Sequence, residues 1–325
     1  MRYRTKTAPI YQTELGGYYL GDTKKVLATK KFIELQGKIQ LVFTSPPFPL
    51  IRKKSYGNAS GEEYIEWLRD YAKDLVSLVT EDGSIVMEIG NAWVPSQPVM
   101  STVVMRALLA FLEEGGLHLC QEFIWYNPAR LPSPAQWVNI ERIRVKDSFT
   151  RVWWMSPTTR PKADNRNILK PYSDSMKKLL ETGKYNAGKR PSEFVIGEQS
   201  FNKNNKGAIP PNVISGDDAQ SITDLLKIAN TKSTTKYREY CKANDIKLHP
   251  ARMPPELAEF FIKFVTDEGD IVLDPFAGSN ITGAVAEKLQ RRWISIERDL
   301  DYAKGSLGRF DEDGILNLSH SILNQ

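Results

Sequence analysis

The sequence has little of what marks disulfide-stabilised, metal-binding or membrane-spanning proteins. Its 325 residues include only two cysteines and three histidines. Cys120 and Cys241 stand far apart, which predicts two reduced thiols, and no Cys/His cluster has the spacing of a metal site. The apolar runs are far shorter than the roughly 20 residues that cross a bilayer, and no apolar segment follows Met1 as in a secretory signal. These absences predict a cytoplasmic protein without a structural metal.

The composition is that of a globular enzyme, but its charge is unevenly spread. Charged residues make up 26% and hydrophobic residues 41% of the chain, whose length is ample for two domains. The chain has a net charge of +5. Residues 161–248 alone have a net charge of +6, with 13 Lys and 3 Arg against 10 acidic residues. Such a block predicts a polyanionic partner, although a solvated surface explains it equally well. The candidate contacts there are Lys189, Arg190, Lys203 and Lys206.

The hydrophobic pattern alternates between strands and helices, which is typical of a mostly parallel α/β sheet. Two aromatic segments, 117–126 and 151–155, predict an antiparallel hairpin that closes one edge of the sheet. Residues 161–248 carry many turn formers and predict a separate, irregular region. The chain therefore divides into residues 1–160, 161–248 and 249–325. Strands are expected over 17–22, 39–43, 84–89, 271–273 and 293–297, and helices over 64–78, 100–112, 257–264 and 281–289.

Two short loops follow predicted parallel strands at distant points of the chain. The first is Thr44-Ser45-Pro46-Pro47-Phe48, and the second is Asp274-Pro275-Phe276-Ala277-Gly278-Ser279-Asn280. In open α/β sheets, ligands bind beyond the carboxyl ends of the strands. We therefore expect both loops to face one crevice.

The second loop has the features of a nucleoside-cofactor turn. Gly278 permits close approach of the backbone, and Glu297, 23 residues after Asp274, ends the next strand where a carboxylate can accept ribose hydroxyls. Only the first and third glycines of G-x-G-x-x-G are present. A carboxylate before the turn would repel a pyrophosphate but suits an ammonium and a sulfonium. S-adenosylmethionine therefore fits better than a dinucleotide; the alternative is a plain strand–helix connection.

The first loop has groups that suit transfer of a methyl group to an exocyclic amine. The Ser45 hydroxyl and the Pro46 carbonyl can accept the amine hydrogens. Pro46 and Pro47 stiffen the loop, and Phe48 offers a flat face for an extruded base. Alone, Ser-Pro-Pro is more often a structural loop. Beyond it, Arg52, Lys53 and Lys54 would lie near the flanking phosphates.

Methylation of a ring carbon requires an activated thiolate, commonly in a Pro-Cys setting. Here Leu119 precedes Cys120 and Tyr240 precedes Cys241. Neither context activates a thiol, so the sequence argues against carbon methylation.

Together these motifs resemble the β-class amino-methyltransferases of bacterial DNA modification, specifically the N4-cytosine enzymes. Further similar segments are 131–134, 144–147 and 209–212. The resemblance implies a Rossmann-like methyltransferase sheet with the catalytic loop ahead of the cofactor turn, a circularly permuted order. It also implies that residues 161–248 recognise the target. Asp22 is expected near the adenine, and His249 and Pro250 over the methionine end of the cofactor.

The same resemblance implies duplex DNA as substrate, a flipped cytosine, a functional pairing with a restriction endonuclease and a monomer or weak dimer. It suggests a CAGCTG-like target. Asn280 departs from the family pattern, where a second glycine is usual. Ser45 ahead of Pro-Pro favours cytosine N4; adenine N6 methylation and a non-catalytic DNA-binding protein are the alternatives. Residues 127–150 could contact DNA or serve packing, and both interpretations stay open.

Overall fold

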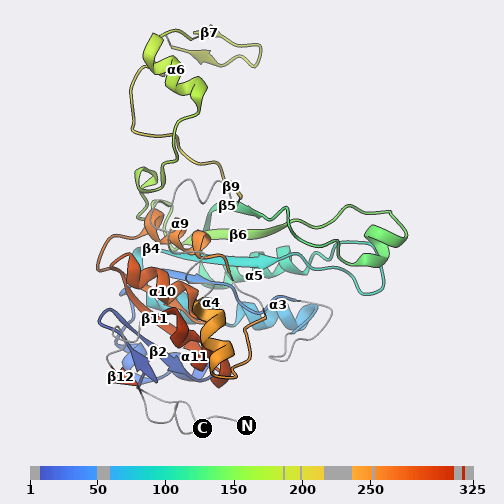
Figure 1. Cartoon of the computed structure of the whole chain (residues 1–325), viewed down its shortest axis with the longest axis vertical. Helices are drawn as coiled ribbons and strands as arrows, with labels where there is room; N and C mark the ends of the chain where they lie inside the picture. The colour runs from blue at the N-terminus through green and yellow to red at the C-terminus, as the bar shows by residue number, and fades with distance from the viewer. Residues whose placement is uncertain are drawn as a thin grey trace.

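The computed structural model describes residues 8–49, 59–185, 187–197, 200–215, 236–250, 253–310 and 317–318. Within them, ten strands form one sheet in the order β12-β1-β2-β11-β10-β3-β4-β6-β5-β9 (Figure 1). The five strands from β2 to β4 in this order are parallel, which confirms the predicted mostly parallel α/β sheet. The strands are β1 (Tyr11–Gln12), β2 (Gly16–Leu20), β3 (Ile39–Thr44), β4 (Val79–Gly90), β5 (His118–Tyr126), β6 (Phe149–Ser156), β9 (Val213–Ser215), β10 (Ile271–Asp274), β11 (Arg292–Glu297) and β12 (Asn317–Leu318).

The predicted antiparallel hairpin is present in β5 and β6. β6 pairs antiparallel with both β4 and β5. The hairpin is not the edge of the sheet, however, because β9 adds a parallel strand beside β5. Ile214 of β9 is buried in the core, so burial of this side chain holds the added strand in place.

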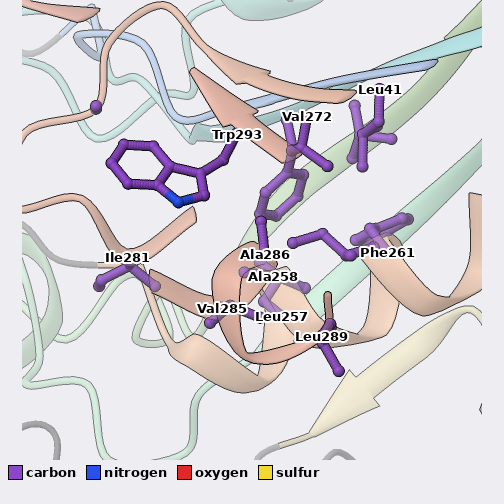
Figure 2. Packing of buried hydrophobic residues seen from close by; sticks show 14 of the residues in the cluster. Leu41, Leu257, Ala258, Phe261, Val272, Ile281, Val285, Ala286, Leu289 and Trp293 are labelled. Atoms are coloured by element: carbon purple, nitrogen blue, oxygen red, sulfur yellow. The ribbon is translucent and has the colours of Figure 1, made fainter. Parts of the chain in front are cut away.

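Helices cover both faces of the sheet, and the side chains of each strand alternate between them. Leu41 and Phe43 of β3 pack toward α9 and α10, whereas Val42 between them packs toward α3, α4 and α5. Figure 2 shows the first of these layers, with Phe261 of α9 near the sheet. The alternation follows the two-residue period of a strand. The helices are α1 (Thr23–Leu27), α2 (Lys30–Ile33), α3 (Glu62–Arg69), α4 (Ala72–Leu78), α5 (Val103–Gly115), α9 (Pro255–Val265), α10 (Ile281–Lys288) and α11 (Leu300–Ser306).

Two elements differ most from the sequence prediction. The helix expected over 64–78 is broken into α3 and α4, and Tyr71 at the break packs on Phe276 with a centroid distance of 5.2 Å. β4 begins at Val79, five residues before the expected start. The pairing of β3 with β4 shifts register there, because Val79 pairs with Ile39 and Ser84 with Leu41.

The segment predicted as a separate target-recognition region has two kinds of structure. One part projects away from the sheet and carries α6 (Asp174–Thr182), β7 (Gly188–Lys189) and β8 (Val195–Ile196) (Figure 1). The other parts lie on the main body: β9 joins the sheet, and a helix over 236–243 places Cys241 against Gly305 of α11.

None of the helices in the described ranges is long and apolar enough to span a membrane. Within the same ranges, no group of three or more His, Cys, Asp or Glu side chains is placed to hold a metal ion.

Candidate active site

A cavity of about 470 Å³ opens at the carboxyl ends of the parallel strands. It lies where β2, β11, β10, β3 and β4 end, the position at which open α/β sheets bind ligands. Both loops singled out in the sequence form its wall, although they lie about 230 residues apart. The predicted site residues that line it are Asp22, Ser45, Pro46, Pro47, Phe48, His249, Pro250, Asp274, Pro275, Phe276, Ala277, Gly278, Ser279 and Glu297.

Asp274 joins the two loops. Its carboxylate accepts hydrogen bonds from Thr44 Oγ1 at 2.8 Å and Thr282 Oγ1 at 2.7 Å, and from the Phe276 amide at 3.1 Å. Thr44 itself is not in the cavity wall, and its hydroxyl acts on Asp274 from behind. Burial raises the pKa of Asp274 to about 6, and these hydrogen bonds oppose that rise. At neutral pH the cavity therefore holds a buried anion that favours a cationic ligand.

At Gly278 the backbone lies directly against the cavity. Its φ of +50° lies in the left-handed region, and a Cβ there would come within 2.9 Å of His249 Nε2. The Gly278 amide donates to Glu297 Oε2 at 2.9 Å, while Glu297 Oε1 accepts from the amides of Arg298 and Asp299. Burial raises the pKa of Glu297. The carboxylate thus fixes the turn from within the cavity wall.

Asn280, the departure from the family pattern, supports the turn rather than the cavity. It is fully buried with a φ of +58°. Its Oδ1 accepts from the Gly283 amide at 3.2 Å and from Ser295 Oγ at 2.6 Å, and its Nδ2 donates to Tyr11 Oη at 2.9 Å. Asparagine tolerates this backbone conformation better than most residues. Its side chain caps α10, so it replaces glycine without entering the ligand space.

Ser45 lies beside Glu88, which the sequence analysis did not select, and the Ser45 hydroxyl lowers the pKa of that carboxyl group. Glu88 is buried near the end of β4 and lines the cavity, and its Oε1 also accepts from Thr150 Oγ1 at 2.9 Å. Burial raises the pKa of Glu88, while the hydroxyls of Thr150 and Ser45 and the charge of Arg130 lower it. One signal could have identified Glu88: it is a carboxylate near the end of the apolar strand expected over 84–89.

Phe48 closes this side of the cavity. A Cβ on Gly90 would lie 2.7 Å from the Phe48 ring, so the glycine lets the ring pack flat against the end of β4. Arg130, from residues 127–150, also lines the cavity. No periodic pattern in that Pro-rich segment pointed to Arg130.

An aromatic wall completes the site on the α3 side. Trp67 contacts Phe276 at a centroid distance of 5.6 Å and Tyr71 at 5.2 Å, and all three line the cavity together with Tyr64. The helical spacing of Tyr64, Trp67 and Tyr71 by itself predicts only packing on the sheet. Their aromatic rings also provide flat apolar surface for a heterocycle.

The predicted DNA-contact residues that the structure describes do not line the cavity. Lys189, Lys203 and Lys206 are exposed and Arg190 is half-buried, all within residues 161–248. Arg52, Lys53 and Lys54 lie outside the described residues. Cys120 and Cys241 form no disulfide and lie away from the cavity wall, and burial raises the pKa of Cys120. A raised pKa disfavours the thiolate that carbon methylation needs.

This site and fold define a DNA methylase. The model of the DNA methylase family matches residues 39–307, and the chain belongs to that family. The protein is therefore a DNA methyltransferase, an enzyme whose methyl donor is S-adenosylmethionine.

Individual relatives refine this class. The Type II methyltransferase M.PvuII of Proteus hauseri is 42% identical over 323 residues, which cover 97% of this chain and 91% of the relative. The Type II methyltransferase M.ScaI of Streptomyces caespitosus is 24% identical over 94% of this chain and 84% of its own length. A solved PvuII DNA methyltransferase, described as cytosine-N4-specific, superposes with a TM-score of 0.72 at 35% identity, covering 99% of this chain and 94% of that one.

Proposed function

We propose that the protein transfers a methyl group from S-adenosylmethionine to the N4 amine of a cytosine within a specific sequence of duplex DNA. The observation that carries this proposal is that one cavity is lined by Ser45, the buried Glu88 and the Asp274 turn. The choice of base is supported by the 42% identity to M.PvuII, because the solved PvuII DNA methyltransferase is described as cytosine-N4-specific.

The residues of the cavity fit a cationic nucleoside cofactor. The raised pKa of Asp274 reflects a buried carboxyl group whose ionised form a positive ligand would stabilise. Phe276 and the aromatic wall offer surface for the adenine, Glu297 and Asp22 offer acceptors for hydroxyl or amine hydrogens, and His249 covers Gly278. When bound, the cofactor supplies an electrophilic methyl group on its sulfonium.

Ser45 and Pro46 would act on the target amine. The N4 lone pair is delocalised into the ring, so acceptors on the amine hydrogens help it to become a nucleophile. Glu88 beside it would accept the Ser45 hydroxyl proton, and the lone pairs of Ser45 Oγ would then accept from the amine. Attack by N4 would break the bond between the methyl group and the sulfonium sulfur, whose electron pair stays on sulfur as a neutral thioether. N4 would then lose one proton, for which Ser45 with Glu88 provides the path. Phe48 would stack on the flipped base.

The remaining partners follow from the same proposal. Lys189, Arg190, Lys203 and Lys206 would contact DNA phosphates from the projecting part of residues 161–248, which we propose as the target-recognition region between two halves of a catalytic domain. A CAGCTG-like target, a cognate restriction endonuclease, a monomeric or weakly dimeric state and the cytoplasm of a bacterium complete the proposal.

The test is to incubate the protein with methyl-labelled S-adenosylmethionine and unmethylated plasmid, then identify the modified nucleoside by mass spectrometry. We expect N4-methylcytosine. Ser45→Ala should abolish most of the product, whereas Ser77→Ala, an exposed serine on α4, should change nothing. N6-methyladenine would overturn the choice of base, and activity that survives Ser45→Ala and Pro46→Gly would overturn the catalytic role of the loop. The absence of any label would favour a non-catalytic DNA-binding protein.

A further inference from the structure

The loop between β5 and β6, residues 127–148, forms an arm that begins at the catalytic cavity. Figure 1 shows it projecting well beyond the sheet, away from the part that carries α6 and β7. Two hydrogen bonds fix its base: Asn91 Nδ2 donates to Asp147 Oδ1 at 2.9 Å, and Arg130 Nη1 donates to the Phe149 carbonyl at 3.0 Å. Since Arg130 also lines the cavity, the arm and the reacting groups have a fixed relation.

Arg144 occupies an unusual position on this arm. Its guanidinium carbon lies 3.1 Å from the centroid of the Trp93 ring, just beyond the end of β4. Both Nη atoms are buried, and neither has a hydrogen-bond partner within the described part of the chain. The acid that acts on it electrostatically is Asp147, whose carboxylate is already bonded to Asn91 and lies 3.8 Å from Arg130. Burial lowers the pKa of Arg144.

The Trp93 ring does not compensate for this burial. A cation–π contact offers no hydrogen-bond acceptor to the Nη donors, and donors taken out of water without an acceptor are unfavourable. A guanidinium also offers its Nη donors in a planar fork that matches two anionic oxygens. Because both Nη atoms have almost no accessible surface here, an anion would reach them when the guanidinium turns outward from the Trp93 ring. The position therefore has the chemistry of a site for an oxyanion.

The surroundings of Arg144 favour nucleic acid as the source of that oxyanion. The arm carries Arg130, Arg142, Arg144 and Lys146 against Glu141 and Asp147, a net charge of +2. It also exposes apolar side chains that no protein segment covers among the described residues: Val145, next to Arg144, is 87% exposed, and Leu131 is 82% exposed. Basic and apolar side chains on one projection suit a partner that combines phosphates with base and sugar surface.

We propose that the arm is a second DNA-binding element, separate from residues 161–248, and that Arg144 binds a backbone phosphate of the strand that carries the target nucleotide. This rests on the proposed function, which places DNA at the cavity. The arm would hold that strand on the side of Glu88 and Phe48, while the projecting part of residues 161–248 approaches the duplex from elsewhere. Trp93 is then a positioning residue for Arg144.

The test measures DNA affinity by fluorescence anisotropy over a series of salt concentrations. Loss of one phosphate contact should weaken binding and reduce the slope of log K against log salt concentration by about 0.9. We expect this for Arg144→Ala. Arg292→Ala removes an exposed cation at the opposite, amino-terminal end of β11 and should leave the slope unchanged. Arg144→Lys retains the charge, so it should keep the slope but bind more weakly because the fork is lost.

An unchanged slope and affinity for Arg144→Ala would overturn the proposal, even if thermal unfolding showed a loss of stability. A weaker affinity with an unchanged slope would also overturn it, because that result indicates contact with a base or a packing role. If Arg144→Ala fails to fold, the Arg144→Lys variant decides, and wild-type DNA affinity of that variant would overturn the proposal. Binding is measured without methyl transfer, so these outcomes are independent of the nucleoside analysis. If the wild-type protein methylates DNA but the Arg144→Ala variant binds DNA normally, the proposed role of the arm is refuted and the proposed function stands.

Discussion

Replacing Asp274 with asparagine should change how stability depends on pH. Burial raises the pKa of this carboxyl group from its ordinary value of 3.8 to about 6. Because the folded protein binds the proton more tightly than the unfolded chain, Asp274 favours folding most at low pH. That contribution is lost as the pH rises from about 3.8 through about 6, and the full loss is about 3 kcal/mol.

Only part of this range is convenient to measure. Between pH 5 and pH 8 the loss attributable to Asp274 is about 1.4 kcal/mol. The side chain of an asparagine at this position could still accept hydrogen bonds from Thr44 and Phe276, but its NH₂ group would face the Thr282 hydroxyl, which would have to reverse. That rearrangement shifts stability by a similar amount at every pH. The informative quantity is therefore the change in the difference between variant and wild type from pH 5 to pH 8.

Urea unfolding of wild type and Asp274→Asn at several pH values supplies that quantity. We expect the variant to gain about 1.4 kcal/mol relative to wild type between pH 5 and pH 8. Asp301→Asn, an exposed acid in the first turn of α11, is the matched control and should follow wild type. Parallel curves for Asp274→Asn and wild type would refute the reasoning, because they would mean that the folded protein does not perturb this carboxyl group.

Three further substitutions test the rest of the site. Gly278→Ala should cost about 1–2 kcal/mol of backbone strain and also weaken cofactor binding by displacing His249. The control Gly116→Ala, at a φ of +59° with open space around it, should cost similar strain but keep wild-type cofactor affinity in calorimetry. Glu88→Gln should lower kcat by about 100-fold with cofactor affinity retained, and an unchanged kcat in single-turnover assays would contradict its role. Asn280→Ala should lower the free energy of unfolding by about 3 kcal/mol because it leaves buried partners unbonded. Asn280→Gly should recover about 1 kcal/mol of that loss, because glycine adopts the left-handed φ without strain. Equal losses for the two variants would show that the left-handed φ carries no strain.

The sheet and the two loops could be predicted because their signals are local. Buried parallel strands such as 39–43 and 271–273 are mostly apolar, and a Pro-Pro or glycine turn follows each one. The rule that ligands bind beyond strand ends then brings Ser45 and Asp274 together without knowledge of the strand order. Tyr71 and Trp67 were assigned to packing by their helical spacing. That assignment is correct but incomplete, since the same rings also face the cavity.

The parts that could not be predicted depend on which strands become neighbours. Glu88 comes to lie near Ser45 only because β4 lies beside β3, and no sequence spacing encodes this adjacency. Arg130 and Arg144 lie in an irregular segment whose path is set by Asn91 and Asp147, residues 56 positions apart. Asn280 could not be assigned a role from sequence, because its three hydrogen bonds reach Tyr11, Gly283 and Ser295.

The turn from Asp274 to Asn280 is bonded from behind along most of its length. Tyr18 donates to the Gly278 carbonyl at 2.7 Å, Thr23 donates to the Pro275 carbonyl at 2.6 Å, and Arg309 donates to the Ser279 carbonyl. A cofactor that docks on such a turn has little backbone left to order, so its association loses little conformational entropy in the protein. Cofactor capture should therefore proceed as a single step at a rate set by diffusion and orientation, without a preceding slow rearrangement of this loop.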